Sequence, residues 1–218
     1  MSNTLKTAVT RTNHDWPLMS QTIHKFINSV ALDPSFQRHG CWNDDMTEEF
    51  IKNLLLGRAP SLIIVANLPK CLELCIIGTP EYEYFKKWLD AGYKWLSIDG
   101  NNRTLALRKY LNNEIGIPNG EISIGKVTFD INKKDNKLKT HSPALKEFIE
   151  NYVSVSICEY VVETRQEVSD IFLAVNDGMP LKPQEKRNAY LCKMADEVRE
   201  MSAKYIDDNK LFKNNIHY

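Results

Sequence analysis

The stretch that decides the fold is Tyr93-Lys-Trp-Leu-Ser-Ile98, followed directly by Asp99-Gly-Asn-Asn-Arg-Thr-Leu-Ala-Leu-Arg-Lys-Tyr-Leu111. The apolar run of the first part predicts a strand over residues 93–98. Apolar residues then recur at helical spacing, which predicts a helix over 100–111 joined to the strand without a loop. Asp99 could cap this helix through its carboxylate, and Gly100 allows a tight turn between the two elements.

On both sides of this junction, segments with helical periodicity alternate with short apolar or alternating segments. We expect helices over residues 22–30, 44–56, 82–89, 142–149, 166–175 and 183–207. We expect strands over residues 61–65, 122–129 and 153–160, and over 72–77 as the neighbour of 61–65. The mixture predicts an α+β domain, a small mixed sheet flanked by helices. Residues 1–20 are expected to form a flexible arm, 21–190 the domain, and 191–218 a C-terminal helical extension.

The charge balance and the cysteines indicate which classes of protein the chain can belong to. The 218 residues carry 28 Lys plus Arg and 28 Asp plus Glu, so the chain lacks the basic excess typical of domains that hold duplex DNA through phosphates. The cluster of Lys133, Lys134, Lys137 and Lys139 is interpreted as a solvated hairpin loop in preference to a nucleic-acid contact. Five scattered cysteines, without a secretory signal or a membrane-length apolar run, indicate reduced thiols in a cytoplasmic protein.

The strand-to-helix junction is also the strongest candidate binding site. Free N–H groups and the helix dipole favour an anion, above all a phosphate, at a helix start. Arg103 would add a charged fork, and the two asparagine amides would add donors and acceptors. The alternative is an ordinary capped helix start with polar residues in its first turn. The residues concerned are Asp99, Gly100, Asn101, Asn102, Arg103 and Thr104.

Two further segments are candidates. Gln37 and Arg38 precede Trp42 in a loop before an acidic helix start and could bind a phosphate or a base edge, although Arg38 could simply pair with Asp44 or Asp45. The third segment runs from 172 to 185 and is also explained as a helix end, a turn at Asn176 and a new helix start. The helix before it is expected to turn four apolar side chains inward: Val168, Ile171, Phe172 and Val175.

The order of the three segments resembles a prokaryotic and phage family with a ParB/sulfiredoxin-like fold, the N-terminal domain of GmrSD-type modification-dependent restriction enzymes and related phage-defence proteins. The matching stretches are Phe36-Gln37-Arg38 with Trp42, Gly57-Arg-Ala-Pro60, Ile98 through Arg103, and Asn176 through Glu185. The resemblance covers residues 30 to 190 and implies binding and hydrolysis of a nucleoside triphosphate, with Mg²⁺ as a further expectation.

Carried over, the resemblance places two parts of the chain at one nucleotide site. Asp99 and Arg103 would be catalytic; the other implied site residues are Gln37, Arg38, Gly100, Asn101, Asn102 and Thr104, with Trp42 and Asn176 in support. Arg38 and Arg103 are therefore expected to approach one cleft. This sequence departs from the family where two central glutamines are Asn101 and Asn102, each one methylene shorter.

Other features of the family are missing from this sequence. The sulfiredoxin-type cysteine is replaced by Asn102, and neither the partner HNH nuclease nor histidines at metal-ligand spacing are present, so no metal site of the chain's own is expected. Two alternatives therefore stay open: a non-catalytic module that senses DNA or binds protein, and a phage DNA-base modification enzyme. The partners expected are a nucleotide and, through a partner domain or protein, modified or phage DNA. Self-association is a further option, and no membrane is expected.

Overall fold

The structure is a computed structural model that describes residues 18–33, 42–59, 61–132 and 136–176. Its strands are β1 Leu18–Thr22, β2 Val30–Ala31, β3 Leu62–Asn67, β4 Trp95–Asp99, β5 Gly120–Ile124, β6 Val127–Ile131 and β7 Ser154–Tyr160. Its helices are α2 Ile23–Ser29, α3 Asp44–Leu55, α4 Leu68–Leu74, α5 Pro80–Asp90, α6 Asn101–Leu111, the 3₁₀ turn η1 Leu138–Thr140, α7 Pro143–Tyr152 and α8 Arg165–Asn176.

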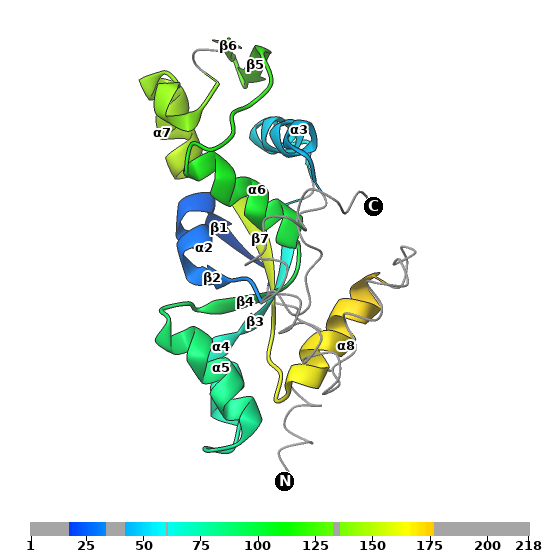
Figure 1. The fold of residues 1–218 in the computed structure, drawn as a ribbon. Helices are drawn as coiled ribbons and strands as arrows, with labels where there is room; N and C mark the ends of the chain where they lie inside the picture. The colour runs from blue at the N-terminus through cyan, green and yellow to red at the C-terminus, as the bar shows by residue number, and fades with distance from the viewer. Residues whose placement is uncertain (1–17, 34–41, 60, 133–135, 177–218) are drawn as a thin grey trace, which may run out of the picture.

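A five-stranded mixed sheet forms the centre of the fold, in the order β1-β7-β3-β4-β2. β7 pairs parallel with β3, β2 pairs parallel with β4, and the other two pairings are antiparallel. A separate hairpin of β5 and β6 lies beside α7 (Figure 1). The α+β class and the small mixed sheet expected from the sequence are therefore confirmed.

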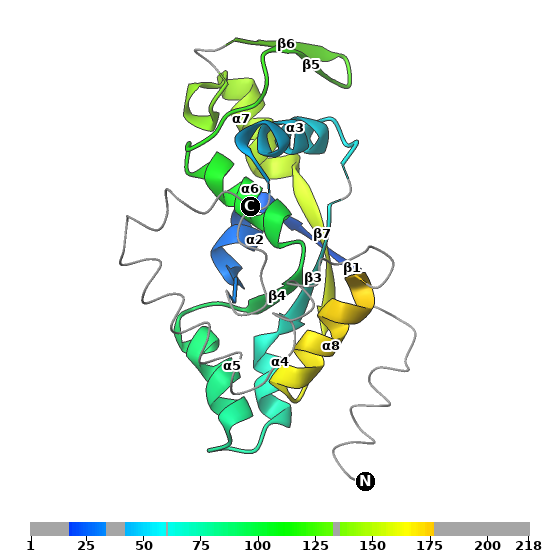
Figure 2. The same ribbon diagram turned by 45° about the vertical axis from the view of Figure 1, so that its right-hand side comes forward.

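Helices cover both faces of the sheet (Figures 1 and 2). Alternate residues of β3 point to opposite faces: Ile63 and Val65 pack with α2, α3, α6 and α7, whereas Ile64 and Ala66 pack with α4, α5 and α8. The two buried clusters make a three-layer arrangement, in which α6 and α8 lie on opposite faces of β4. The C-terminal end of β4 therefore lies between the two helix layers.

The decisive junction has the predicted form. β4 and α6 are separated by Gly100 alone, although the strand begins at Trp95, later than residue 93. Most of the other expected elements are also present with ends shifted by one to three residues. Residues 183–207 and 191–218 lie outside the described residues.

The expectation of a strand over 72–77 is wrong. Residues up to Leu74 belong to α4, which Asn67 caps by accepting a hydrogen bond from the Lys70 N–H at 3.2 Å, with Pro69 in the first turn. Ile76 and Ile77 are 70% and 81% exposed, so their apolar character does not mark a buried strand.

Two further expectations need correction. The single strand over 122–129 is a hairpin, because Gly125 adopts a φ of +62° and turns the chain between β5 and β6. In α8, Val168 and Phe172 are buried as expected, but Val175, next to the last residue of the helix, is 40% exposed. β1 starts at Leu18, within the segment expected to be an arm, and pairs with β7.

Candidate functional site

Gly100 turns the chain from β4 into α6. Its φ is +93°, and a Cβ at this position would lie 3.2 Å from two atoms of the Ile63 side chain. The first hydrogen bond of the helix runs from the Thr104 N–H to the Gly100 carbonyl at 2.9 Å. The N–H groups of residues 101–103 consequently have no acceptor within the helix and are directed out of its start. Only glycine meets both the backbone angle and the close packing on β3.

The expected cap by the Asp99 carboxylate is wrong. Gly100 occupies the N-cap position, and no side chain in the described part of the protein caps α6. A bulge precedes Asp99: Val65 pairs with Ser97 but Ile64 pairs with Asp99, which leaves Ile98 as an extra residue in β4. Bulges of this kind redirect the side chains beside them. Asp99 does not cap α6 and instead forms an ion pair with Arg103, four residues later.

A pocket of about 200 Å³ lies at this junction. It is bounded by the start of α6, by the end of α8 and by the residue that precedes the Asn43 cap of α3. The lining residues are Trp42, Asp99, Gly100, Asn101, Asn102, Arg103, Phe172 and Asn176. Seven of them are among the residues that the sequence predicted for the site, drawn from three separate segments. The structure brings the described residues of these segments together.

The Arg103 guanidinium is held at the edge of the pocket by two partners. Its Nη1 donates a hydrogen bond to the carbonyl of Leu62, and its Nη2 lies 3.7 Å from Asp99 Oδ2. The side chains of Arg103 and Asp99 are each about a quarter exposed, at 25% and 24%. A cation in the first turn opposes the helix dipole, and these two acceptors offset part of that cost. Arg103 is thus fixed in place, and its exposed part faces the pocket.

The polar residues of the first turn differ in their environment. The Asn101 Oδ1 atom is buried and has no hydrogen-bond partner among the described residues. Asn102 also lines the pocket. Thr104 is fully buried, donates from its hydroxyl to the Gly100 carbonyl at 3.1 Å, and is absent from the pocket lining. The polar surface offered to a ligand is therefore made by residues 99–103, together with Asn176 from α8.

Two aromatic side chains complete the pocket. Phe172 is 6% exposed and packs from α8, and Asn176 donates its amide to the Phe172 carbonyl at 2.8 Å. Trp42 lies with its ring centre 5.2 Å from that of Phe50. The sequence predicts Phe172 as an inward-facing residue at the start of the third candidate segment, but not as a site residue. Its place in the pocket depends on how α8 packs on β4, which no local pattern encodes.

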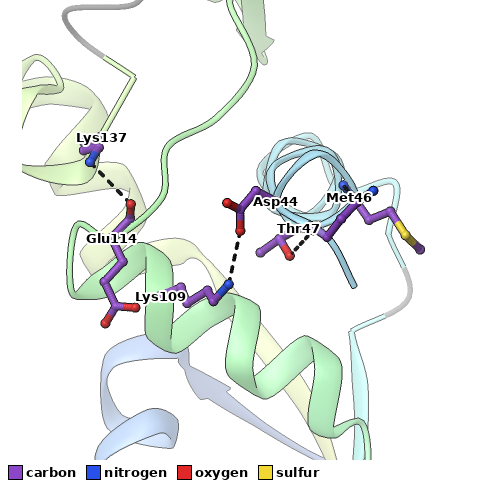
Figure 3. A network of polar contacts seen from close by, with 7 residues as sticks. Asp44, Met46, Thr47, Lys109, Glu114 and Lys137 are labelled. Atoms are coloured by element: carbon purple, nitrogen blue, oxygen red, sulfur yellow. Dashed lines mark hydrogen bonds and ion pairs between the residues drawn. The ribbon is translucent and has the colours of Figure 1, made fainter. Parts of the chain in front are cut away.

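An ion pair joins α3 to α6 just after Trp42 in the chain (Figure 3). The Asn43 side chain caps α3 by accepting a hydrogen bond from the Met46 N–H at 2.8 Å. Lys109 of α6 then lies 3.2 Å from Asp44, the first residue of α3, and the figure shows the two side chains pointing toward each other. Asp44, which was considered as a partner of Arg38, thus pairs with Lys109.

Gln37 and Arg38 lie outside the described residues, as does the segment after Asn176. The approach of Arg38 to Arg103 therefore stays a prediction. The described residues on either side are informative, because Trp42 follows the first segment, Asn176 precedes the second, and both line the pocket. Of the expected lysine cluster, the described Lys137 donates to the Glu114 carbonyl at 3.3 Å (Figure 3).

The described cysteine thiols do not line the pocket. Burial raises the pKa of the Cys71 thiol to about 12, and its sulfur accepts a hydrogen bond from the Val162 N–H at 3.3 Å. Cys75 is only partly buried and donates to the Glu163 carbonyl. In the part of the chain that the structure describes, no group of three or more His, Cys, Asp or Glu side chains is arranged to hold a metal ion.

The fold defines an α+β domain with a pocket at the start of α6, lined in part by two aromatic side chains. Residues 20–192 match the family of the GmrSD restriction endonuclease N-terminal domain, and the chain belongs to this family. It is therefore a restriction-related domain. No curated protein and no solved structure matches the chain, so the likeness to the ParB/sulfiredoxin fold stays a prediction. Among the described residues, no helix has both the length and the apolar character needed to cross a membrane.

Proposed function

We propose that this domain binds a nucleoside triphosphate in the pocket at the start of α6, as part of a restriction system. The observation that carries the proposal is the helix start itself: three N–H groups without intrahelical acceptors, a left-handed glycine that leaves no side chain in the way, and a fixed guanidinium beside them. Such donors bind phosphate oxygens well because the helix dipole adds to each hydrogen bond.

Charge in the pocket supports the phosphate end of this proposal. Arg103 is the cation that lines the described pocket, and its pairing with Asp99 leaves part of the guanidinium exposed. Gln37 and Arg38, which the family resemblance assigns to the same site, would add a second cation. Two cations at one site repel each other unless an anion lies between them, which favours a polyanionic ligand.

The aromatic walls support the nucleoside end. Trp42 and Phe172 offer apolar surface to a base or a ribose next to the polar helix start. Complete ligand sites measure roughly 300–1,000 Å³. The described pocket, at about 200 Å³, is therefore large enough for part of a nucleotide, and further contacts are assigned to the segment that holds Gln37 and Arg38.

Hydrolysis is the further step of the proposal. Asp99 is the carboxylate in the pocket lining and would orient water or accept Mg²⁺ that arrives with the nucleotide, since Mg²⁺ commonly binds one or two carboxylates plus substrate phosphates. When bound, the ion would neutralise phosphate charge. Asn101 and Asn102 have shorter reach than glutamine, which specifically favours a second candidate, a binding module that no longer hydrolyses its nucleotide. DNA-base modification stays a third alternative.

Calorimetric titration tests the proposal. ATP, GTP, CTP and UTP are titrated with and without Mg²⁺, and the matching nucleoside and monophosphate serve as controls. We expect the triphosphate to bind and the nucleoside to bind much more weakly, because the α6 start contacts phosphate. Release of phosphate by the wild type separates hydrolysis from binding alone. Equal affinity for nucleoside and triphosphate, or no binding by any of them, would contradict the proposal.

A further inference from the structure

A second polar network lies outside the pocket, where the chain leaves β2. Asp33 is only 4% exposed, and its Oδ2 accepts a hydrogen bond of 2.7 Å from the Tyr84 hydroxyl. The guanidinium carbon of Arg165 lies 5.4 Å from the centre of the Tyr84 ring. Asp33 lies two residues after β2, Tyr84 belongs to α5, and Arg165 is the first residue of α8. A buried carboxylate needs such partners, since burying it unpaired is costly.

The position of this network relates it to the pocket. β2 runs parallel to β4, with Val30 beside Trp95 and Ala31 beside Leu96, so both strands leave the sheet at the same edge. Asp33 follows β2 there, and Asp99 ends β4 there. Arg165 begins α8, the same helix that brings Phe172 and Asn176 into the pocket. The network thus joins the chain leaving β2 to a helix that forms a pocket wall.

We propose that the Tyr84–Asp33 hydrogen bond positions α8, one wall of the nucleotide pocket, an inference that rests on the proposed function. Tyr84 does not line the pocket, so it would act only through its neighbours. Its hydroxyl is held by Asp33, and its ring supports the start of α8 through Arg165. Burial and the adjacent Asp33 carboxylate raise the pKa of Tyr84 well above its ordinary value, so the hydroxyl keeps its proton across the physiological range.

The test compares two tyrosine variants. Tyr84→Phe removes only the hydroxyl and keeps the ring beneath Arg165. Tyr110→Phe is the matched control, because it also removes a buried hydroxyl, one that lies 2.7 Å from His141 Nε2 in the other helix layer. Triphosphate Kd, the urea midpoint and amide hydrogen exchange in α8 are measured for both variants and for the wild type.

For Tyr84→Phe we expect Kd to rise about three- to tenfold, which lies within the range for residues that couple to a site without touching its ligand, together with faster exchange in α8. For Tyr110→Phe we expect a comparable shift of the urea midpoint, with Kd and α8 exchange as in the wild type. Wild-type Kd and exchange in Tyr84→Phe, or an equal loss of affinity in both variants, would overturn the inference. If the wild type binds no triphosphate, the proposed function fails, and exchange in α8 alone then decides whether Tyr84 positions the pocket wall.

Discussion

Two features of the structure require a glycine at position 100. Its backbone lies in the left-handed region, and its Cα packs against Ile63 so closely that a methyl group would have to displace that side chain. The same geometry leaves the helix start open to a ligand. The residue therefore links folding and binding, and its replacement should affect both.

We expect Gly100→Ala to lower the free energy of unfolding by about 2–3 kcal/mol, since a positive φ costs roughly 1–2 kcal/mol for a residue with a Cβ and the contact with Ile63 adds to it. Gly92→Ala is the matched control, because Gly92 has a φ of +90° but open space around a Cβ. Gly92→Ala should lower the free energy of unfolding only by the cost of the positive φ. Urea unfolding of both variants measures the difference. Equal losses would show that the Ile63 side chain moves aside at no energetic cost.

Arg103 and Arg108 permit a second comparison within one helix. Arg103 donates to the Leu62 carbonyl of β3, and Arg108 Nη2 donates to the Val30 carbonyl of β2 at 3.3 Å, but only Arg103 lines the pocket. We expect Arg103→Ala to weaken triphosphate binding about 10- to 100-fold, the value of one charge-assisted contact. Arg108→Ala should leave Kd unchanged while costing similar stability.

Calorimetry and urea midpoints for the same two variants check this prediction. Wild-type affinity in Arg103→Ala, combined with a large fall in its midpoint, would show that Arg103 serves only to tie α6 to β3 and Asp99. An equal loss of affinity in Arg108→Ala would show that the effect comes from displacement of the whole helix.

At the scale of the elements, a buried carboxylate joins three strands at the end of the sheet away from the pocket. Glu159 of β7 is 8% exposed and accepts hydrogen bonds from the indole N–H of Trp95, at the start of β4, and from the side chain of Asn67, at the end of β3. Lys70 lies 3.7 Å from the same carboxylate but is 56% exposed. The hydrogen bonds from the two buried donors should therefore contribute more to the free energy of unfolding than the ion pair with Lys70.

We expect Glu159→Ala to lower the free energy of unfolding by about 2–4 kcal/mol, because both donors would be left buried without an acceptor. Lys70→Ala should cost less than about 1 kcal/mol, as for exposed ion pairs generally. Chemical denaturation of the two variants gives both values. A larger loss for Lys70→Ala than for Glu159→Ala would show that charge, not hydrogen bonding, holds this end of the sheet.

The elements that the sequence predicts correctly are those whose signals are local. The β4–α6 junction is predictable because an apolar run, a glycine and a helical repeat follow one another. The apolar residues from 72 to 77 predict a strand, but Asn67 and Pro69 are ordinary helix-start signals and the chain forms α4 up to Leu74. β1 carries no such signal, and it is a strand because β7 offers it a partner.

The same distinction applies to the candidate site. The residues around Gly100 were predictable from one continuous motif, and the family resemblance added Trp42 and Asn176. Phe172 was recognised as a core residue, but its contact with the pocket depends on the packing of α8 against β4. The role of Asp33 was not predicted at all, because its partners Tyr84 and Arg165 are distant in sequence.

At the scale of the whole molecule, the two buried clusters share one sheet, and neither can persist without it. The described domain should therefore unfold as one cooperative unit. The reactivity of Cys71 can be used to measure this cooperativity. The residue is fully buried on the α4 side of the sheet, and the raised pKa of its thiol leaves almost no thiolate near neutral pH.

We expect Cys71 to react with maleimide at pH 7.5 only through global unfolding, so that its labelling in rising urea follows the unfolding transition seen by circular dichroism. Cys75, which is partly exposed, should be labelled in the native state. Peptide mapping by mass spectrometry separates the two sites. Labelling of Cys71 well below the urea midpoint would show that the α4 layer opens independently of the rest.

The most direct test of the central claim, that the start of α6 binds the phosphates of a nucleoside triphosphate, is the backbone amide spectrum of ¹⁵N-labelled protein during triphosphate titration. We predict that the largest shifts arise at residues 100–103, whose N–H groups would donate to phosphate oxygens, and that the matching nucleoside leaves these amides unmoved. Shifts confined to other parts of the domain, or amides of 100–103 that stay in place at saturating triphosphate, would contradict the account.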